Sequence, residues 1–481
     1  MDLIIESIAA AVSGRVLQGS PRKRVEGVST DSRSIRPGEL FIPLKGEHFD
    51  GHDFIVPALQ AKASGIIISR DWKGGNLPPD IPVIEVADTL TALGDLARAW
   101  VQHTQATIIA VTGSNGKTTT REMTAAILER SHTVLKPRCN WNNLIGLPLT
   151  LLGLGPHHQM AVLELGMNRR GEIRRLAEIA QPRIGVITNV GPVHLEYLKT
   201  LEEVARAKGE LFESLGSGSH AVINADDSRV AALARRCPAQ IMTFGIASPA
   251  QVRALDIASP ASGGNRFILA VGEESAPVSL RIPGMHSIYN ALAAAAVASL
   301  CRVGMQEIKA GLEGYTSFPG RMEIIRLDDD ITIINDTYNA NPTSMEIALT
   351  TLAQLKGAGR GIAVLGDMLE LGETSEAYHR QLGSLITTLQ ISLVILTGAH
   401  AQTVAAGAGD KGTAGASISI ADTHEEIAAQ LDRTVQPHDW ILFKGSRGMR
   451  MEKSMELFRQ LRNARTGRPS FVPAVGAGCN H

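Results

Sequence analysis

The chain has 481 residues and a formal net charge of −1, with 44% hydrophobic and 20% charged residues. This length exceeds one compact core, so we expect two to four domains, and the near-zero charge excludes a global field that would attract nucleic acid or an anionic membrane. The four cysteines show no C-x-x-C spacing, which argues against a zinc site or disulfide framework and is typical of a reducing cytosol.

Residues 1–100 predict a first, smaller α/β domain. Its opening 19 residues indicate a short amphipathic helix and not a signal peptide, because no basic segment precedes the apolar residues and Glu6 interrupts them. Short strands at 65–69 and 82–86 lie among polar, turn-rich stretches, and a helical pattern covers 90–100.

Residues 101–316 predict a second domain built on a parallel sheet. Short apolar runs alternate here with helical patterns, at 107–111, 160–166, 184–190 and 220–225. These runs are apolar enough to be strands buried on both faces, as in a parallel sheet with crossover helices. Alternating strands around 252–282 indicate a small antiparallel appendage. The Ala-rich run at 291–300 is too short for a bilayer and predicts a buried helix, so we expect a cytoplasmic protein.

Residues 317–465 predict a third domain, which follows a stretch punctuated by Gly and Pro. It repeats the alternation of strands and helices, with strands at 361–366, 392–398 and 439–445 and helices near 374–389 and 449–463. The final segment, 466–481, is rich in Gly, Pro and Ala and is predicted to be disordered.

A glycine-rich loop, TGSNGKTT, follows the strand at 107–111 and precedes a helical pattern. Glycines allow backbone angles at which successive N–H groups converge on phosphate oxygens, and the helix N-terminus adds its dipole. A lysine in this place supplies charge to the β- and γ-phosphates, and the next Thr a hydroxyl to Mg²⁺. A chance GKT in a turn is the weaker alternative. The loop predicts ATP binding by Gly113, Ser114, Asn115, Gly116, Lys117, Thr118 and Thr119.

This loop is shortened, with two residues between Gly113 and Gly116, and it resembles that of the Mur ligases and the folylpolyglutamate synthases. Similarity to the Mur ligases extends through most of the chain. In order, the similar segments are TDSRSIRPGELFIPLKGEHFDGHDF, NWNNLIGLPLTLL, LELGMNRRGEI, ITNVGPVHLEYL, ARAKGELFESL, PGMHSIYNALAAAA, FPGRMEI, INDTYNANPTSM, LGDMLELGETS and FKGSRGMRME.

The resemblance implies a UDP-sugar-binding N-terminal domain, a central ATPase domain and a C-terminal Rossmann-like domain that binds a dipeptide. DTYNANP and GDMLELG are similar to the branch that joins D-alanyl-D-alanine to UDP-N-acetylmuramoyl-tripeptide, and the D-N-P-R motif of the diaminopimelate-adding branch is absent. The implied reaction passes through an acyl phosphate made with ATP, which the incoming amine then attacks. We expect the enzyme to be a monomer.

The resemblance also implies two Mg²⁺ ions. Glu164 ends a strand, where its carboxylate suits Mg²⁺, although a buried carboxylate paired with an arginine is the alternative. His194 matches a family histidine at the second metal, whereas a lone histidine is more often structural. Lys208 resembles the lysine that Mur ligases carry as a metal-binding carbamate, and a solvated helix lysine is its alternative. Carbamylation requires the neutral amine, so the pKa of Lys208 must fall or metal must trap the product.

His286 and Asn290 lie four residues apart on one helix face and resemble the family's adenine contacts, although Ser287 stands where Asn is usual. Arg321 resembles an arginine that reaches the γ-phosphate across the domain gap, and Asp336 resembles the acid that contacts the ribose. The implied catalytic group is Lys117, His194, Lys208 and Arg321, and the implied metal group is Thr118, Glu164, His194 and carbamylated Lys208.

For the UDP substrate, Ser32, Arg33 and Lys45 match the stretch that binds the diphosphate, and Asn142 and Asn143 match a pair that faces the sugar-peptide. Turn formation explains the Asp31-Ser32 and Asn142-Asn143 pairs equally well at the local level. The candidates for the dipeptide are Tyr338, Asn339, Asn341, Lys444, Ser446 and Arg447.

Two other functions stay open. Another Mur ligase or a folylpolyglutamate synthase-like ligase is disfavoured by the N-terminal DSR…PGELF…DGHDF block, which suits a UDP-sugar. A nucleotide-driven switch ATPase would form no covalent product, and the sequence shows no obvious partner segment for one. Phosphate release that requires both acceptor and amine distinguishes a ligase from the switch.

Overall fold

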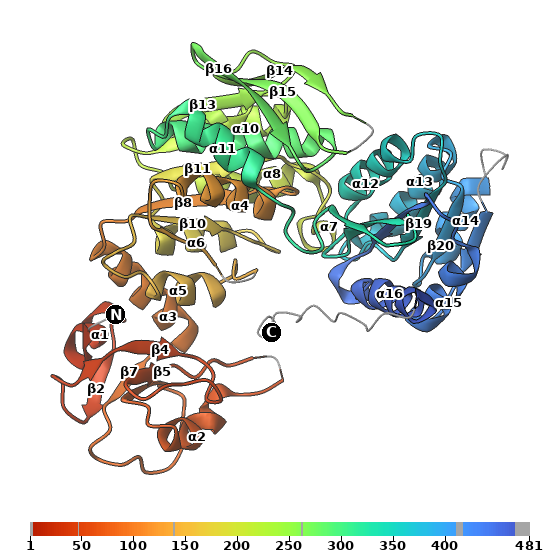
Figure 1. The fold of residues 1–481 in the computed structure, drawn as a ribbon. Coiled ribbons are helices and arrows are strands. Elements are labelled where there is room, and N and C mark those ends of the chain that lie inside the picture. The colour runs from red at the N-terminus through yellow and green to blue at the C-terminus, as the bar shows by residue number, and fades with distance from the viewer. Residues whose placement is uncertain (1–2, 47, 138–139, 261–262, 410–416, 467–481) are drawn as a thin grey trace.

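The structure, a computed structural model, describes residues 3–46, 48–137, 140–260, 263–409 and 417–466. Figure 1 shows three lobes in chain order, each containing a sheet with helices packed against it. The predicted α/β class is therefore confirmed. The predicted tail lies outside the described residues apart from Thr466, which ends a helix.

The N-terminal lobe holds a five-stranded sheet of order β2-β7-β6-β5-β4 and a two-stranded pair, β1 with β3. Its elements are β1 Leu3–Ile4, α1 Ile5–Ala11, β2 Arg15–Gln18, β3 Arg24–Val25, β4 Gly27–Ser29, β5 Glu39–Phe41, α2 Ile55–Gln60, β6 Gly65–Ser69, β7 Val83–Val86 and α3 Thr89–Gln102. The first helix is shorter than the 19-residue segment predicts. Beyond its end the chain leaves the helical path at Ser13, which takes a left-handed backbone conformation, and Gly14 then passes close to Ile84, where a Cβ would lie 2.6 Å from Cγ2.

The central lobe contains a nine-stranded sheet of order β16-β15-β14-β13-β12-β11-β8-β10-β9. Its strands are β8 Thr107–Thr112, β9 Val134–Leu135, β10 Met160–Glu164, β11 Ile184–Ile187, β12 His220–Asn224, β13 Gln240–Gly245, β14 Val252–Ala258, β15 Asn265–Val271 and β16 Glu274–Leu280. In this spatial order, all neighbouring strands from β14 through β8 to β9 pair in parallel. The strands β10 and β11 are buried along their whole length. The predicted antiparallel appendage is instead the antiparallel edge of this sheet, joined through β13 and β14.

Helices cover both faces of the central sheet. They are α4 Lys117–Leu128, α5 Gly146–Leu152, α6 Glu172–Ala180, α7 Leu195–Leu198, α8 Leu201–Glu213, α9 Ser228–Leu233, α10 Met285–Leu300 and α11 Met305–Gly314. Every residue from Ala291 to Ala298 in α10 is buried, and the small side chains let this helix pack closely on α4. The prediction of a buried helix here is confirmed. No helix among the described residues has the length and apolarity needed to span a membrane.

The C-terminal lobe has a six-stranded sheet of order β17-β18-β22-β19-β20-β21, parallel except for β17. Its elements are β17 Glu323–Arg326, β18 Thr332–Asp336, α12 Pro342–Leu355, β19 Gly361–Leu365, α13 Ser375–Thr388, β20 Leu393–Leu396, α14 Ala401–Gly409, β21 Ser417–Ile420, α15 His424–Thr434, β22 Trp440–Lys444 and α16 Glu452–Thr466. All three predicted strands are present as β19, β20 and β22.

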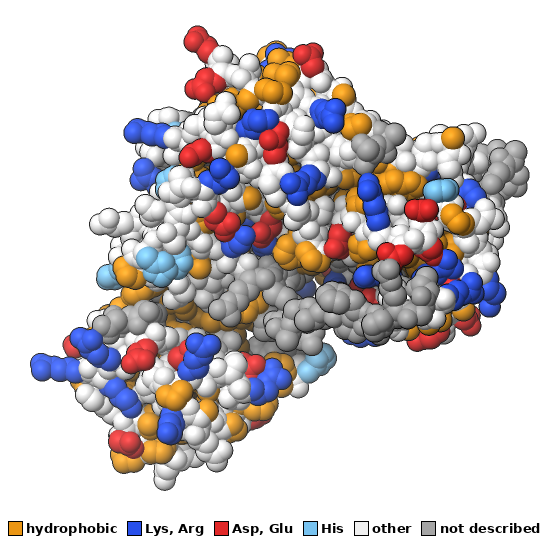
Figure 2. Space-filling view, in the orientation of Figure 1, with side chains coloured by type: hydrophobic (Ala, Val, Ile, Leu, Met, Phe, Trp, Pro, Cys, Tyr) orange, Lys and Arg blue, Asp and Glu red, His pale blue; other side chains and the backbone are white. Residues whose placement is uncertain are grey.

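The fold brings strand ends from two lobes to one place. The carboxyl ends of β8, β10 and β11 share one edge of the central sheet, where parallel sheets usually bind ligands. In Figure 1, α7 lies next to the C-terminal lobe at this edge. On the face shown in Figure 2, basic and acidic side chains are intermixed, so charge must be concentrated locally to hold an anion.

Candidate functional site

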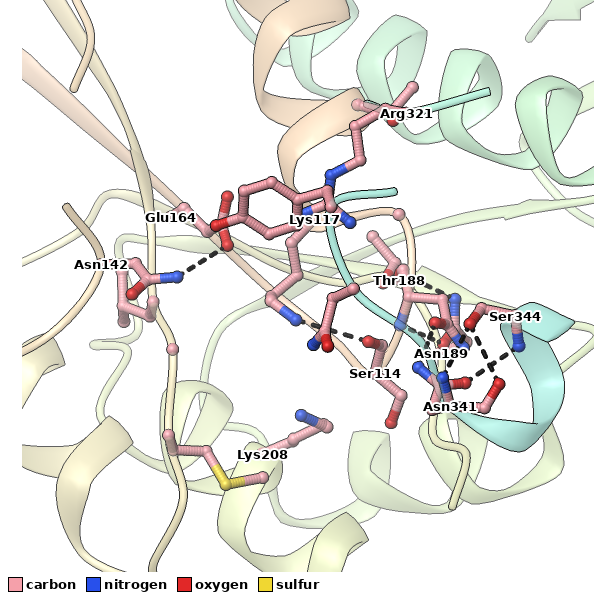
Figure 3. A pocket seen from close by; sticks show the side chains of 18 of the residues that line it. Ser114, Lys117, Asn142, Glu164, Thr188, Asn189, Lys208, Arg321, Asn341 and Ser344 are labelled. Carbon is pink, nitrogen blue, oxygen red and sulfur yellow. Dashed lines mark hydrogen bonds between the residues drawn. The ribbon is translucent and has the colours of Figure 1, made fainter. Parts of the chain in front are cut away.

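The principal cavity lies between the central and C-terminal lobes and has a volume of about 730 Å³. Most of the predicted site residues line it. They are Ser114, Asn115, Gly116, Lys117, Thr119, Asn142, Asn143, Glu164, His194, Lys208, His286, Asn290, Arg321, Asp336, Tyr338, Asn339, Asn341 and Lys444. Figure 3 shows that Lys117, Glu164, Lys208 and Arg321 surround one space, although they come from four separate segments.

The glycine loop joins β8 to α4 at the edge of this cavity. Gly116 has φ +81°, and a Cβ there would lie 2.2 Å from Asn290 Oδ1, so this position requires glycine on two grounds. Asn189, just beyond β11, fixes the loop, because its carbonyl accepts from Ser114 N and its Oδ1 accepts from Asn115 N, both at 2.9 Å. The first turn of α4 then presents its N–H groups, which suits a phosphate.

Lys117 Nζ donates to the carbonyl oxygen of Gly113 at 2.9 Å, within its own loop. Burial lowers the pKa of Lys117, and Glu164 opposes this effect. The ammonium is therefore held beside the loop by weak, neutral acceptors. A phosphate oxygen is a stronger, charged acceptor for the same group.

Thr118 and Glu164 form a pair of hard oxygen donors at the base of the loop. Thr118 Oγ1 donates to Glu164 Oε2 at 2.8 Å, and Asn142 Nδ2 donates to Glu164 Oε1 at 2.9 Å. Burial alone raises the pKa of Glu164, but nearby cations, led by Lys117, bring it below its usual value. Arg121 Nη1 lies 3.7 Å from Oε2, so the predicted alternative of an arginine-paired carboxylate also holds.

This donor set is compatible with Mg²⁺. Among the described residues, no group of three or more His, Cys, Asp and Glu side chains could hold a metal alone. Mg²⁺ usually takes one or two protein oxygens and completes its shell with phosphates and water. Thr118 and Glu164, next to the phosphate loop, provide such a partial shell.

Lys208 is contributed by α8 and is 2% exposed. The alternative of a solvated helix lysine is therefore wrong. The side chain makes no hydrogen bond or ion pair with another described residue. Burial, reinforced by the charge of Lys117, holds the pKa of Lys208 well below its ordinary value. The neutral amine that carbamylation requires is consequently favoured at this site.

His194 precedes α7 and meets the C-terminal lobe. Its Nδ1 lies 2.6 Å from Glu370 Oε2. The sequence analysis missed Glu370, because the two residues are 176 positions apart. His194 and Lys208 line the same cavity.

Arg321 reaches the central lobe from the start of the C-terminal lobe. Its Nη2 donates to Thr118 Oγ1 at 3.2 Å, and its guanidinium lies over the Tyr338 ring, 3.8 Å from the ring centroid. Stacking of this kind holds the planar group in one orientation. The guanidinium is thus directed at the phosphate loop.

His286 and Asn290 share one face of α10, as their spacing predicts. Asn290 Oδ1 accepts from Thr120 Oγ1 at 3.3 Å, and burial lowers the pKa of His286 to about 4. His286 Nδ1 has no hydrogen-bond partner among the described residues. Ser287, the departure from the family pattern, is fully buried and donates to the carbonyl oxygens of Ile282 and Gly284. It stabilises the turn before α10 and does not face the cavity.

Asp336 and Lys444, which the sequence analysis assigned to different ligands, contact each other directly. Lys444 Nζ forms a buried ion pair with Asp336 Oδ2 and donates to the carbonyl oxygen of Asn339 at 3.0 Å. Asp336 Oδ1 accepts from Met322 N at 3.1 Å. The pair stabilises the loop after β18, and both residues also line the cavity, so their assignments to the dipeptide and the ribose stay predictions.

Two dipeptide candidates, Ser446 and Arg447, lie outside the cavity. Ser446 is 3% exposed, accepts from Leu369 N at 2.8 Å and donates to the carbonyl oxygen of Ala340. Arg447 is exposed and pairs with Glu452 at 3.1 Å. Asn341 lines the cavity but caps α12 and donates to Asn115 Oδ1 at 2.7 Å, so it connects the two lobes.

The structure does not bring the N-terminal candidates to this cavity. Ser32, Arg33 and Lys45 are absent from its lining, and the exposed Arg33 pairs with Asp31 at 2.7 Å. Asn142 and Asn143 do line it, but Asn142 bonds to Glu164 and Asn143 Oδ1 accepts from the backbone at the start of α5. The predicted UDP site is therefore divided between two lobes.

Three family models match most of the chain. Residues 24–101 match the Mur ligase family catalytic domain, 111–298 the Mur ligase middle domain and 320–447 the Mur ligase glutamate ligase domain. The chain belongs to the Mur ligase family. The loop around Lys117 thus lies in the middle domain of a Mur ligase, Arg321 comes from its glutamate ligase domain, and the cavity is lined by both.

Individual relatives cover the same extent. This Mur ligase is 37% identical over 450 residues to the UDP-N-acetylmuramoyl-tripeptide–D-alanyl-D-alanine ligase of Bacillus subtilis, covering 93% of this chain and 96% of the relative. A MurF crystal structure from Acinetobacter baumannii superimposes with a TM-score of 0.87 at 33% identity, covering 95% and 99% of the two chains. The Thermotoga maritima MurF ligase in complex with ADP gives 0.82 at 28% identity, covering 91% and 98%.

Proposed function

We propose that this Mur ligase joins D-alanyl-D-alanine to UDP-N-acetylmuramoyl-tripeptide, with ATP converted to ADP and phosphate, in the synthesis of peptidoglycan precursors. The observation that carries the proposal is the cavity where the phosphate loop, Glu164 and Lys208 meet Arg321 from the other lobe. The activity named for the Bacillus relative and the similarity to the ADP-bound MurF structure support it. ATP and a UDP-linked substrate are both cytoplasmic, so we place the reaction in the cytoplasm.

The first chemical step activates the tripeptide. Its terminal carboxylate attacks the γ-phosphorus of ATP, the bond to the β-phosphate oxygen breaks, and ADP leaves with that electron pair. Lys117 and Arg321 neutralise the charge that develops on the transferred group, and the first-turn N–H groups of α4 hold the β-phosphate. Thr118 and Glu164 would hold a Mg²⁺ ion, which supplies further positive charge to the phosphate oxygens.

The second step forms the amide. The amine of D-alanyl-D-alanine attacks the acyl carbon, a tetrahedral intermediate forms, and phosphate departs as the amine loses a proton. Tyr338 and Asn339, which face the cavity from the C-terminal lobe, are our candidates for contacts with the dipeptide. His286 and Asn290 are the candidates for the adenine, and the unpartnered His286 Nδ1 supports this assignment.

We further propose that Lys208 works as a carbamate. Its neutral amine attacks CO₂, an N–C bond forms and one proton is lost, which leaves an anionic group with two oxygens. The burial of Lys208, its lowered pKa and its lack of a described partner all support this step. The carbamate and His194 would then hold a second Mg²⁺ ion.

The proposed division of labour follows the three predicted domains. Residues 1–100 bind the UDP-sugar through Ser32, Arg33 and Lys45, 101–316 bind ATP, and 317–465 bind the dipeptide. The first boundary falls in the last turn of α3, and the second falls between α11 and β17.

A coupled phosphate-release assay tests the function. We expect ATP-dependent phosphate release only when UDP-N-acetylmuramoyl-tripeptide and D-alanyl-D-alanine are both present, and no signal from Lys117→Ala. Release with neither substrate would favour the switch ATPase. Equal release with diaminopimelate or glutamate as the amine would favour another ligase of the superfamily.

A further inference from the structure

Glu370 connects the loop after β19 to the central lobe through two separate contacts. Its Oε2 lies 2.6 Å from His194 Nδ1, and its carbonyl oxygen accepts from Glu196 N at 3.0 Å. Side chain and backbone therefore bind the same short segment, 194–196, of the other lobe. The contact therefore does not depend on one flexible side chain alone.

Both partners in this contact have unusual backbone conformations. His194 has φ +55° and Glu370 has φ +62°, in the left-handed region that non-glycine residues rarely adopt. Gly372, two residues after Glu370, also has a positive φ, and a Cβ on it would lie 3.0 Å from Glu196 Cα. Such conformations persist where the surrounding structure determines them, and they concentrate at functional sites. The two loops are thus built to meet closely.

The loop that carries Glu370 is fixed to its own lobe. Met368 N donates to His379 Nε2 at 3.0 Å, and Leu369 N donates to Ser446 Oγ at 2.8 Å. His379 and Ser446 are both buried. The carboxylate therefore arrives at His194 from a rigid support when the two lobes are in contact.

We propose that Glu370 is a positioning residue that sets the tautomer and orientation of His194 when the C-terminal lobe is docked. An ionised carboxylate can only accept hydrogen bonds, so His194 Nδ1 must carry a proton, and in the neutral ring the lone pair then lies on Nε2. When one ring nitrogen of a histidine binds a metal, a carboxylate that accepts from the other nitrogen fixes the tautomer and the orientation of the ring. The inference rests on the proposed function, because His194 belongs to that site. Under this proposal, the tautomer and orientation of His194 depend on docking of the C-terminal lobe.

Kinetics of matched variants provide the first measurement. Glu370→Ala should lower kcat by about 10–100-fold, the range typical of lost partners of this kind, while KM for ATP changes less than about threefold. Glu370→Gln should fall in between, because an amide can either accept from Nδ1 or donate to it. The control is Glu373→Ala, which removes an exposed carboxylate from the same segment and should leave kcat unchanged. Equal melting temperatures would confirm that all three variants fold.

The second measurement observes the ring directly. Histidine-selective ¹⁵N NMR of the protein with a non-hydrolysable ATP analogue reports which nitrogen carries the proton, and His194→Gln identifies the signal. We expect the Nδ1–H form in the wild type and in Glu373→Ala, and the Nε2–H form to dominate in Glu370→Ala.

An unchanged tautomer in Glu370→Ala overturns the proposal, whatever the rates. So does a kcat equal to that of Glu373→Ala. If the wild type shows no ligation at all, the proposed function fails, but the tautomer measurement still stands. The two failures are therefore distinguishable.

Discussion

At the scale of single residues, Lys208 offers the sharpest test of the chemistry. If its working form is an anionic carbamate, Lys208→Arg should be as damaging as Lys208→Ala, because arginine keeps the charge but cannot form the carbamate. Both should lose at least about 100-fold in kcat, the loss expected when a charge-stabilising group is removed. Acetate should partly restore Lys208→Ala by placing a carboxylate in the vacated space, and it should not restore Lys208→Arg.

The control for this experiment is Lys199→Arg, an exposed lysine close by in the chain. Surface substitutions of this kind are usually neutral, so its steady-state rates should match the wild type with and without acetate. If Lys208→Arg is better tolerated than Lys208→Ala and acetate has no effect, Lys208 acts as a cation and the carbamate proposal is wrong.

Sequence alone predicted the residues carried by local motifs and missed those defined by contacts between distant segments. The loop around Lys117 predicted the bend at Gly116, since strand, glycines and helix follow one another directly. Nothing in the sequence around Lys444 indicates that it forms an ion pair with Asp336, 108 positions away. Asn189 follows a buried strand, and the rule that ligands gather at the carboxyl ends of parallel strands could have identified it.

At the scale of elements, the turn from β8 into α4 depends on Gly116. Gly116→Ala adds a left-handed strain of about 1–2 kcal/mol and also forces its Cβ against Asn290 Oδ1, 2.2 Å away. Gly171, which precedes α6, has a similar φ of +91° but open space around the new Cβ, so Gly171→Ala is the matched control. Both variants should lose stability in thermal unfolding, and Gly116→Ala should lose more because of the added close contact. Only Gly116→Ala should weaken ATP binding by at least about tenfold in calorimetry, and equal affinities would contradict this account of the loop.

Whole elements were predicted best where their pattern is decided locally. Apart from Glu164 at the end of β10, the strands β10 and β11 are apolar because both faces of the sheet are covered, and this pattern is visible in the sequence. The attachment of β14 to the central sheet rests on a short register with β13, between 244–245 and 252–253, which no periodicity reveals. The sequence therefore predicted alternating strands around 252–282 correctly but assigned them to a separate appendage.

At the scale of the molecule, the proposed nucleotide contacts are divided between two lobes. Lys117 and Asn290 belong to the central lobe, and Arg321 donates across to Thr118 from the C-terminal lobe. Asn341 donates to Asn115 within the phosphate loop, and Glu370 meets His194. A ligand that contacts both sides stabilises the arrangement in which they face each other.

We therefore expect the domains to close during turnover. Small-angle scattering of the protein with an ATP analogue and UDP-N-acetylmuramoyl-tripeptide should give a smaller radius of gyration than the free protein, because both ligands favour the docked lobes. Arg321→Ala should show less compaction at the same ligand concentrations, since the guanidinium can no longer link the phosphates to the C-terminal lobe. Arg326→Ala, which removes an exposed arginine from β17 of the same lobe, is the control and should compact like the wild type. An unchanged radius in every ligand state would mean that the contacts between Arg321 and Thr118 and between Asn341 and Asn115 exist without substrate, and closure could not then be part of the cycle.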